Sequence, residues 1–339
     1  MSKQVKHLSL ALQGGGAHGA FTWGVLDRFL EREDLVLDGF VGTSAGAMNA
    51  SVLAYGLHIG GREKARELLN KFWKVTSDSA ASSPLQPTWF DGYFGKKGNM
   101  DFSPFYRATE VMSLFFSPYQ SPIQANPLRP ILEDLVDFNE LKKCTVTKLY
   151  VCATNVRRGR ARVFGLDEMS IDAVLASACL PTLFPAVTID GEDYWDGGYM
   201  GNPPIFPLIS GDACADIMLV QINPINIPKT PKTPEEIRDR INELSFNSSL
   251  MLEMRRVSFV DRLIDMGINP DSMFKKIRIH NINPEKDMWE WNLSSKLNAT
   301  WDFLTDLKEL GRKYADEWLT ENYEHIGVKA TCDVRATFL

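Results

Sequence analysis

Short apolar runs alternate with helical patterns along the first two thirds of the chain. Residues 5–12 and 36–41 have the length and composition of strands, and each leads through a glycine-containing turn into a helical pattern. Further strands are predicted at 148–156, 160–164, 215–222 and 276–282, and a hairpin (186–189 with 194–195) around Asp190-Gly191. Strand–helix alternation of this kind predicts a three-layer α/β fold with a central, mainly parallel sheet.

Helical spacing of apolar residues places the remaining elements. Helices are predicted over residues 20–31, 45–57, 61–75, 171–178 and 235–266, and a last amphipathic helix contains Trp301 and Trp318. We expect a catalytic core at 1–225, including an aromatic, lid-like segment at 78–125. A mostly helical C-terminal extension at 235–339 is expected to pack on this core, with no clear boundary between the two.

Composition narrows the class of protein. The chain has 339 residues, 44% of them hydrophobic, and a formal net charge of -6. This is enough apolar material for a large core, and the acidic balance argues against nucleic acid as a partner. The five cysteines are scattered and form no C-x-x-C pair, which favours reduced thiols in a cytoplasmic compartment.

The chain shows neither a signal peptide at residues 1–12 nor an apolar stretch of 18 residues. We therefore expect a soluble protein, whose contact with membranes or lipid surfaces, if any, is peripheral.

Ser44 stands in the motif Gly42-x-Ser44-x-Gly46, between a predicted strand and a predicted helix. A serine on such a tight turn adopts strained backbone angles, and the flanking glycines remove clashes with neighbouring side chains. The motif is therefore a candidate nucleophile elbow. A small-residue turn with an N-cap serine is the alternative.

A second glycine motif, Gln13-Gly14-Gly15-Gly16-Ala17-His18-Gly19, also joins a strand to a helix. Its backbone N–H groups could hold an anion, as a phosphate cradle or as an oxyanion hole. The nucleotide-binding patterns fit poorly, because no Gly-Lys-Ser/Thr closes the loop and the G-x-G-x-x-G pattern is met only loosely.

The third motif is Asp196-Gly197-Gly198 at the end of a predicted strand. A carboxylate there can reach the tip of a neighbouring strand, although Asp-Gly is also a common turn.

Taken together, the three motifs resemble the patatin family of lipid acyl hydrolases. The family has a glycine-rich oxyanion loop, then G-x-S-x-G, then D-G-G or D-G-A, in this order. The stretch 176–181, Ala-Ser-Ala-Cys-Leu-Pro, is similar to the region that precedes the family's aspartate. The resemblance covers about residues 5–225. One departure is His18, which stands where the family usually has Arg or Lys and leaves a lasting positive charge at that position in doubt.

The resemblance implies a chemistry. Ser44 would be the nucleophile, Asp196 its base, and the N–H groups of Gly14, Gly15 and Gly16 the oxyanion hole. The substrate would be a phospholipid, lysophospholipid or other acyl lipid, with no metal or organic cofactor. A Ser–His–Asp triad would instead need His280 or His325, the two histidines that follow the acid in the chain.

Three other functions stay open from the sequence: an acyltransferase or polyester depolymerase that uses the same site, a non-catalytic lipid-binding protein, and a nucleotide-binding protein. The segment 81–125 contains ten aromatic residues in 45 positions. It could pack a small core of its own or form an apolar entrance for acyl chains. The oligomeric state cannot be inferred.

Overall fold

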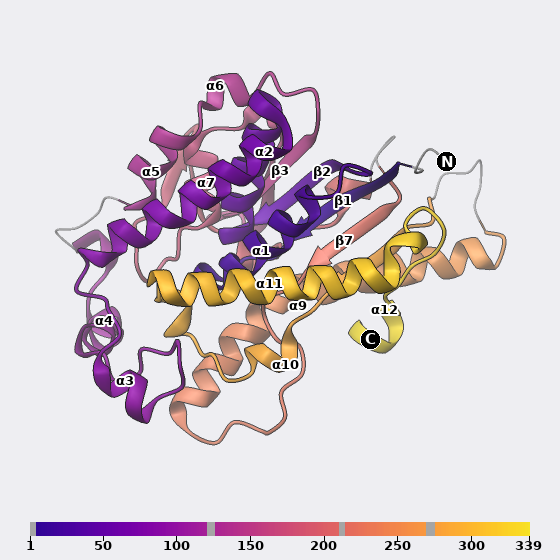
Figure 1. Ribbon diagram of the computed structural model, residues 1–339. Helices are drawn as coiled ribbons and strands as arrows, with labels where there is room; N and C mark the ends of the chain where they lie inside the picture. Colours follow the sequence, from indigo (N-terminus) through magenta and orange to yellow (C-terminus); the bar gives the residue numbers. More distant parts are fainter. Residues whose placement is uncertain (1–4, 121–125, 210–213, 269–274) are drawn as a thin grey trace.

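The computed structural model describes residues 5–120, 126–209, 214–268 and 275–339, and in these a single eight-stranded sheet runs through the molecule (Figure 1). Its order is β5-β6-β3-β2-β1-β7-β8, with β4 paired to β3. The strands are β1 (Lys6–Leu12), β2 (Leu35–Thr43), β3 (Lys148–Asn155), β4 (Arg160–Phe164), β5 (Val187–Ile189), β6 (Glu192–Asp196), β7 (Asp216–Val220) and β8 (Arg278–Ile282).

The five strands β3, β2, β1, β7 and β8 are parallel, and β4, β5 and β6 add antiparallel pairs beside β3. The expected mainly parallel sheet is therefore confirmed. The predicted hairpin is confirmed as well: Asp190 and Gly191 link β5 to β6 with φ values of 50° and 75°. Positive φ at both positions is what a two-residue type I′ turn requires.

Helices cover both faces of this sheet. They are α1 (Gly19–Leu30), α2 (Ala45–Ala81), α3 (Trp89–Phe94), α4 (Pro104–Phe115), α5 (Leu128–Leu135), α6 (Phe138–Leu141), α7 (Ile171–Ser177), α8 (Phe206–Ile209), α9 (Pro234–Asp265), α10 (Glu285–Met288), α11 (Trp301–Asn322) and α12 (Val334–Phe338).

Alternation along the strands divides the apolar core into two layers. Leu10 and Leu12 of β1 face a core that includes buried residues of α1, α2 and α11. Ala11, on the opposite face, packs in a second core with Leu250 and Met254 of α9. Helices therefore lie on both sides of the sheet, which confirms the three-layer α/β architecture.

The two helices predicted over 45–57 and 61–75 are the two arms of α2. The helical backbone breaks at Gly60 and Gly61, and Gly61 has a φ of 71°. A positive φ is readily adopted by glycine and rarely by other residues, so this pair sets the kink.

The C-terminal region is built into the core. It supplies β8 at the edge of the sheet, α9 on one face and α11 on the other. Helices α1 and α11 approach closely at two glycines: a Cβ on Gly24 would lie 1.9 Å from the Lys308 carbonyl oxygen, and one on Gly311 would lie 2.0 Å from the Phe21 carbonyl oxygen. Both positions exclude any side chain.

Candidate active site

Ser44 occupies a sharp corner between β2 and α2. Its φ of 54° and ψ of -123° make it one of the two non-glycine residues with positive φ in the described ranges. A Cβ on Gly42 would lie 2.4 Å from the Gly46 carbonyl oxygen, and one on Gly46 would lie 2.2 Å from the Leu12 carbonyl oxygen. The turn can form only because both flanking positions lack a side chain.

The sheet register brings Asp196 to this corner. Thr43, the last residue of β2, pairs with Cys152 of β3, and the next residue of β3, Ala153, pairs with Asp196 of β6. The Asp196 carboxyl thereby reaches the Ser44 hydroxyl, whose hydrogen bonding lowers the carboxyl pKa. Two residues 152 positions apart in the chain are thus neighbours, because they lie at the carboxyl ends of β2 and β6, the two strands that flank β3.

Burial sets the acidity of Asp196. Desolvation raises its pKa to about 7, and the Gly198 N–H, the Ser44 hydroxyl and the charge of Lys296 oppose this rise. The Gly198 N–H donates to Asp196 Oδ1 at 2.7 Å. A carboxylate whose pKa is near neutrality is a far better general base for a hydroxyl than one with an ordinary pKa near 4.

The two positions after Asp196 must also be glycine for steric reasons. A Cβ on Gly197 would lie 2.1 Å from the Cys152 carbonyl oxygen, and one on Gly198 would lie 2.3 Å from the Phe246 ring. Phe246 belongs to α9, so the C-terminal region closes over the Asp-Gly-Gly turn.

The glycine loop between β1 and α1 lies against the serine. A Cβ on Gly14 would lie 2.8 Å from the Ser44 Cβ. The Gly14 N–H already donates to Asn202 Oδ1 at 2.7 Å, whereas the N–H groups of Gly15 and Gly16 have no acceptor within the described residues. The structure therefore separates the three proposed oxyanion donors: two are available, and the third holds the loop in place.

A network of buried amide side chains fixes this loop, and sequence reasoning missed it. Gln13 Oε1 accepts from the N–H groups of Ile222 and Asn223, and Gln13 Nε2 donates to Asn247 Oδ1 at 2.8 Å. Asn223 Nδ2 donates to the Gly14 carbonyl at 2.8 Å. Residue spacing gives no signal for such a network, because its members are distant in the chain.

Ser177, at the end of α7, also belongs to the corner. Its Oγ accepts the backbone N–H of Ser44 at 2.8 Å, and its side chain is fully buried. The stretch 176–181 therefore supports the backbone of the candidate nucleophile.

The histidines do not complete a triad. His280 is fully buried in β8, and its two ring nitrogens lie 2.9 Å from Thr331 Oγ1 and 3.0 Å from Asp216 Oδ1. Asp216 begins β7, at the end of the sheet opposite to Ser44. His325 lies in a short 3-10 turn, η7 (Tyr323–His325), after α11 and has no hydrogen bond to either candidate residue.

His18 is buried and neutral. Its Nε2 lies 2.7 Å from Ser295 Oγ, and its ring packs against Trp291 and Phe303. Burial, followed by the nearby charge of Lys296, lowers its pKa to about 3. His18 therefore supplies no positive charge beside the glycine loop.

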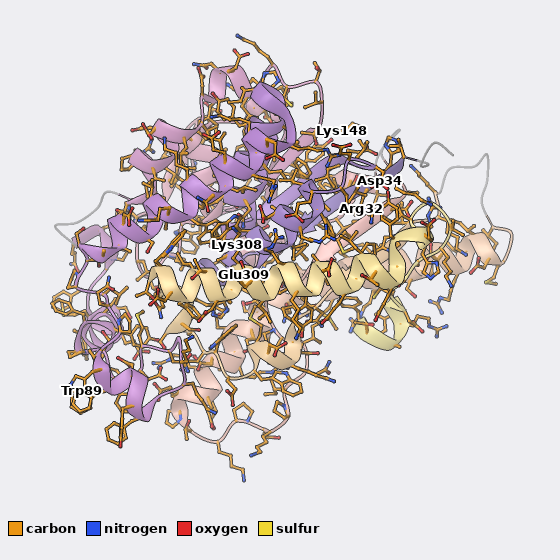
Figure 2. All side chains as sticks on the ribbon, in the orientation of Figure 1. Arg32, Asp34, Trp89, Lys148, Lys308 and Glu309 are labelled. Atoms are coloured by element: carbon orange, nitrogen blue, oxygen red, sulfur yellow. The ribbon has the colours of Figure 1, made fainter. Side chains whose placement is uncertain are left out.

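The aromatic segment is mostly exposed. Of its ten aromatic residues only Tyr106 is buried; Trp89 and Phe115, for example, expose 69% and 75% of their surface. Figure 2 shows Trp89 at the outer edge of the molecule, on α3. Of the two alternatives for this segment, a buried core of its own is therefore wrong for the nine exposed rings. Residues 121–125 of the segment lie outside the described residues.

Two kinds of feature are absent from the described ranges. No helix in them is both long and apolar enough to cross a membrane. No group of three or more His, Cys, Asp and Glu side chains in them could hold a metal ion.

A family model described as "Patatin-like phospholipase" matches residues 10–209, from β1 to α8. The matched range contains the glycine loop, Ser44 and Asp196. Among curated proteins, the uncharacterized protein YjjU of Escherichia coli (strain K12) is 23% identical over 299 residues, which cover 87% of this chain and 73% of YjjU.

Solved structures similar to this chain include VipD and ExoU. VipD from Legionella pneumophila has a TM-score of 0.36 and 16% identity, with 91% of this chain and 67% of VipD covered. ExoU of Pseudomonas aeruginosa, in its heterodimeric complex with SpcU from the type III secretion system, has a TM-score of 0.41 and 15% identity. There the similarity covers 95% of this chain and 52% of the other, so the chain spans about half the length of ExoU.

Proposed function

The chain belongs to the patatin-like phospholipase family, and we propose that it is a serine lipid acyl hydrolase with a Ser44–Asp196 dyad. Its substrates are carboxylic esters of phospholipids, lysophospholipids or related acyl lipids. Family membership supports lipid hydrolysis. One observation carries the dyad: the hydroxyl of a strained serine lies beside a buried carboxyl whose pKa is about 7.

Acylation follows from this pair. Asp196 accepts the hydroxyl proton as Ser44 Oγ attacks the ester carbonyl carbon. The tetrahedral intermediate then collapses, and the protonated Asp196 returns the proton to the departing alcohol oxygen. The products are the free alcohol or lysolipid and an acyl-serine ester.

Deacylation repeats the steps with water. Asp196 accepts a proton from the water as its oxygen attacks the acyl-serine carbonyl, and the second collapse returns this proton to Ser44 Oγ. A free fatty acid is released. Each proton moves between groups of this chain, substrate and water, so the proposal requires no metal or organic cofactor.

The N–H groups of Gly15 and Gly16 are our candidates for stabilising the tetrahedral oxygen. They lie on the loop that contacts the Ser44 Cβ, and they have no acceptor among the described residues. Preorganised donors of this kind are among the largest contributions to catalysis, and the loss of one costs about 3 kcal/mol in serine hydrolases.

We further propose that α3 and α4 meet the lipid surface from which the substrate is taken. Their exposed rings include a stacked pair, Trp89 and Phe90, with ring centroids 3.8 Å apart. Together with five free cysteines, this favours a cytoplasmic protein with peripheral contact to lipid.

Release of free fatty acid from a long-chain phospholipid tests the proposal. Ser44→Ala and Asp196→Asn should each lower kcat about 10²-fold to 10⁴-fold. The matched controls are Ser248→Ala, an exposed serine on α9, and Asp193→Asn, on the same strand as Asp196. Substantial turnover by either folded dyad variant would overturn the assignment. Transfer of the acyl group to an added alcohol instead of water would make the enzyme an acyltransferase.

A further inference from the structure

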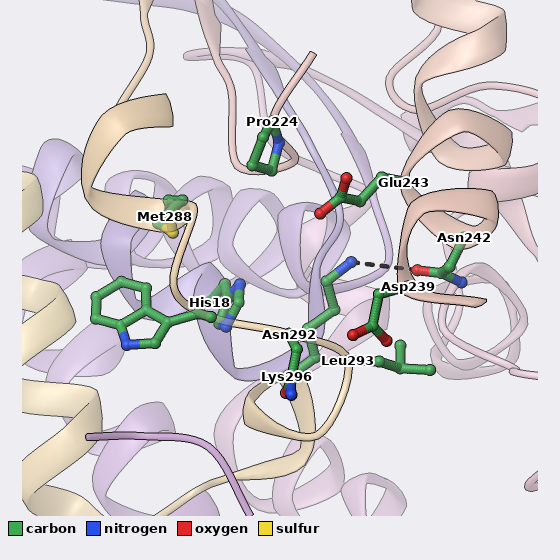
Figure 3. A pocket seen from close by; sticks show the side chains of 10 residues that line it. His18, Pro224, Asp239, Asn242, Glu243, Met288, Asn292, Leu293 and Lys296 are labelled. Carbon is green, nitrogen blue, oxygen red and sulfur yellow. Dashed lines mark hydrogen bonds between the residues drawn. The ribbon is translucent and has the colours of Figure 1, made fainter. Parts of the chain in front are cut away.

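Lys296 lies between the glycine loop and α9. It belongs to a short 3-10 turn, η6 (Ser295–Leu297), and its carbonyl oxygen would be 2.3 Å from a Cβ on Gly16. Its Nζ donates to Asn223 Oδ1 at 2.8 Å and to Asn242 Oδ1 at 3.3 Å. Figure 3 shows this side chain among polar groups of α9, with the bond to Asn242 as a dashed line.

The side chain is joined to the candidate oxyanion loop through one residue. Asn223 accepts from Lys296 through Oδ1 and donates through Nδ2 to the Gly14 carbonyl. Gly14 in turn lies against the Ser44 Cβ and directly precedes the two free N–H groups. The position of the ammonium group and the orientation of the loop are therefore coupled.

Burial lowers the pKa of Lys296, and the carboxyls of Glu243, Asp239 and Asp196 oppose this fall and favour its charged form. The groups that face it are Asp239 and Glu243 on α9, His18 on the loop side and Asp196. Desolvation raises the pKa of Asp239 to about 6, so this carboxyl gives up much of its charge below neutral pH. Glu243 is also paired with Arg240 at 2.9 Å.

The groups around Asp196 determine how the charge of Lys296 affects its carboxyl. Cys152, Cys179 and Tyr199 face Asp196, and burial raises the pKa of all three, which keeps them neutral. Lys296 is the cation that lowers the pKa of Asp196 and so opposes its desolvation. Because His18 is neutral, the positive charge at this site comes from the C-terminal region rather than from the loop itself.

We propose that Lys296 is a positioning residue of the acyl-transfer site: through Asn223 it holds the glycine loop and with it the candidate oxyanion donors, and its charge favours the Asp196 carboxylate. The inference rests on the proposed function and adds to it a residue outside the range that the family model matches. A purely structural Lys296 would only offset the carboxylates of α9.

Three substitutions at Lys296 distinguish the proposed positioning role from a purely structural one. Lys296→Met removes both the charge and the bond to Asn223, Lys296→Gln keeps a donor without the charge, and Lys296→Arg keeps the charge. Lys313→Met, at an exposed lysine of α11 paired with Glu317, is the control. Turnover of a short soluble ester is measured against pH, together with a melting curve for each variant.

Lys296→Met should lower kcat about tenfold or more with KM nearly unchanged, because oxyanion stabilisation acts in the transition state. Without the cation the pKa of Asp196 rises, so the acid limb of kcat/KM should move to higher pH in both the Met and Gln variants. Lys296→Arg should return the limb towards the wild-type position. If Lys296→Met does not fold, the Gln and Arg variants carry the same comparison.

The outcomes distinguish this inference from the function on which it rests. If the wild-type protein hydrolyses no ester and a fluorophosphonate does not label Ser44, the proposed function fails. If the wild type is active and the pH profiles of the Met and Gln variants match that of Lys313→Met, the Lys296 inference alone is overturned. Activity losses that only follow the melting temperature also overturn it.

Discussion

At the residue scale, Ser44 and Asp196 could be proposed from the sequence because each stands in a short motif with flanking glycines. A serine at positive φ needs small neighbours, and Gly42 and Gly46 stand at positions where a Cβ would meet backbone atoms. The serine and the two glycines lie within five positions of one another, so this requirement is visible in a short motif.

The residues that support Ser44 and Asp196 do not stand in a recognisable motif. Asn202, Asn223, Asn247 and Lys296 meet the glycine loop only because the sheet and α9 bring distant segments together. An asparagine or a lysine is an ordinary surface residue in a sequence. The sequence indicates that His18 carries no lasting charge, but only the structure offers a lysine in its place.

The raised pKa of Asp196 predicts a specific dependence of stability on pH. The folded carboxyl has a pKa of about 7, and the unfolded one about 4, so the folded state binds this proton more tightly. The resulting contribution to the free energy of unfolding is full below about pH 4 and is lost as the pH rises through 7.

Asp196→Asn carries no such charge. Its melting temperature relative to wild type should therefore rise between pH 5 and pH 8, as measured by thermal denaturation across this range. Ser248→Ala, which removes no ionisable group, is the control and should show no such trend. Parallel wild-type and Asp196→Asn curves would mean that Asp196 titrates normally and is a poor base.

At the element scale, strands and long helices followed from hydrophobic periodicity, and their ends from glycine and turn residues. The predicted strands 5–12, 36–41 and 148–156 correspond to β1, β2 and β3 within two residues at each end. The role of residues 89–119 did not follow, because aromatic residues are equally suited to a core and to an interaction surface.

The glycine loop gives a prediction of its own. Gly15 has an extended φ of 176°, and an added Cβ would lie 2.8 Å from Ile222 Cγ2, so Gly15→Ala should shift the loop slightly without unfolding it. We expect kcat to fall about 10-fold to 100-fold with little change in KM, because small displacements of positioned groups are costly. Gly92→Ala, where a Cβ would contact nothing within 4 Å, is the control. A change confined to KM would point to ground-state binding.

The exposed rings at the C-terminal end of α4, those of Phe115 and the following Phe116, give a further prediction. Phe115 and Phe116 expose 75% and 54% of their surface, so replacing both with Ser should leave the melting temperature nearly unchanged. Hydrolysis of long-chain lipid in vesicles should fall, whereas a soluble butyrate ester should be cleaved normally, because an extracted acyl chain needs apolar cover at about 0.8 kcal/mol per CH₂.

Val328→Ser, an exposed apolar residue after α11, controls for general surface effects. Equal loss of both activities with a lower melting temperature would place the two rings in the core. The acyl entrance would then have to lie elsewhere.

At the scale of the whole molecule, the strand order could not be predicted from the sequence. It depends on how the connections between strands cross the sheet, and this is decided by packing between distant segments. The topology places β1 in the middle of the five parallel strands, with β2 and β7 beside it, and the C-terminal β8 at an edge of the sheet. Through α9 and α11 the region 235–339 covers both faces of the sheet. We propose that this region and residues 1–225 unfold as one cooperative unit.

Gly311→Ala tests whether the two regions unfold cooperatively. The added Cβ would lie 2.0 Å from the Phe21 carbonyl oxygen, so α11 and α1 must separate. We expect a loss of about 2 kcal/mol in the free energy of unfolding, and a single transition in urea for both wild type and variant. Two transitions, with only one shifted, would show that the regions unfold independently.

The central claim, that Ser44 is a nucleophile activated by Asp196, is tested most directly by a fluorophosphonate probe followed by peptide mapping. The account predicts covalent modification at Ser44, no labelling in Ser44→Ala, and labelling slowed about 10²-fold or more in Asp196→Asn. Modification of a different residue, or unchanged labelling of Asp196→Asn, would contradict it.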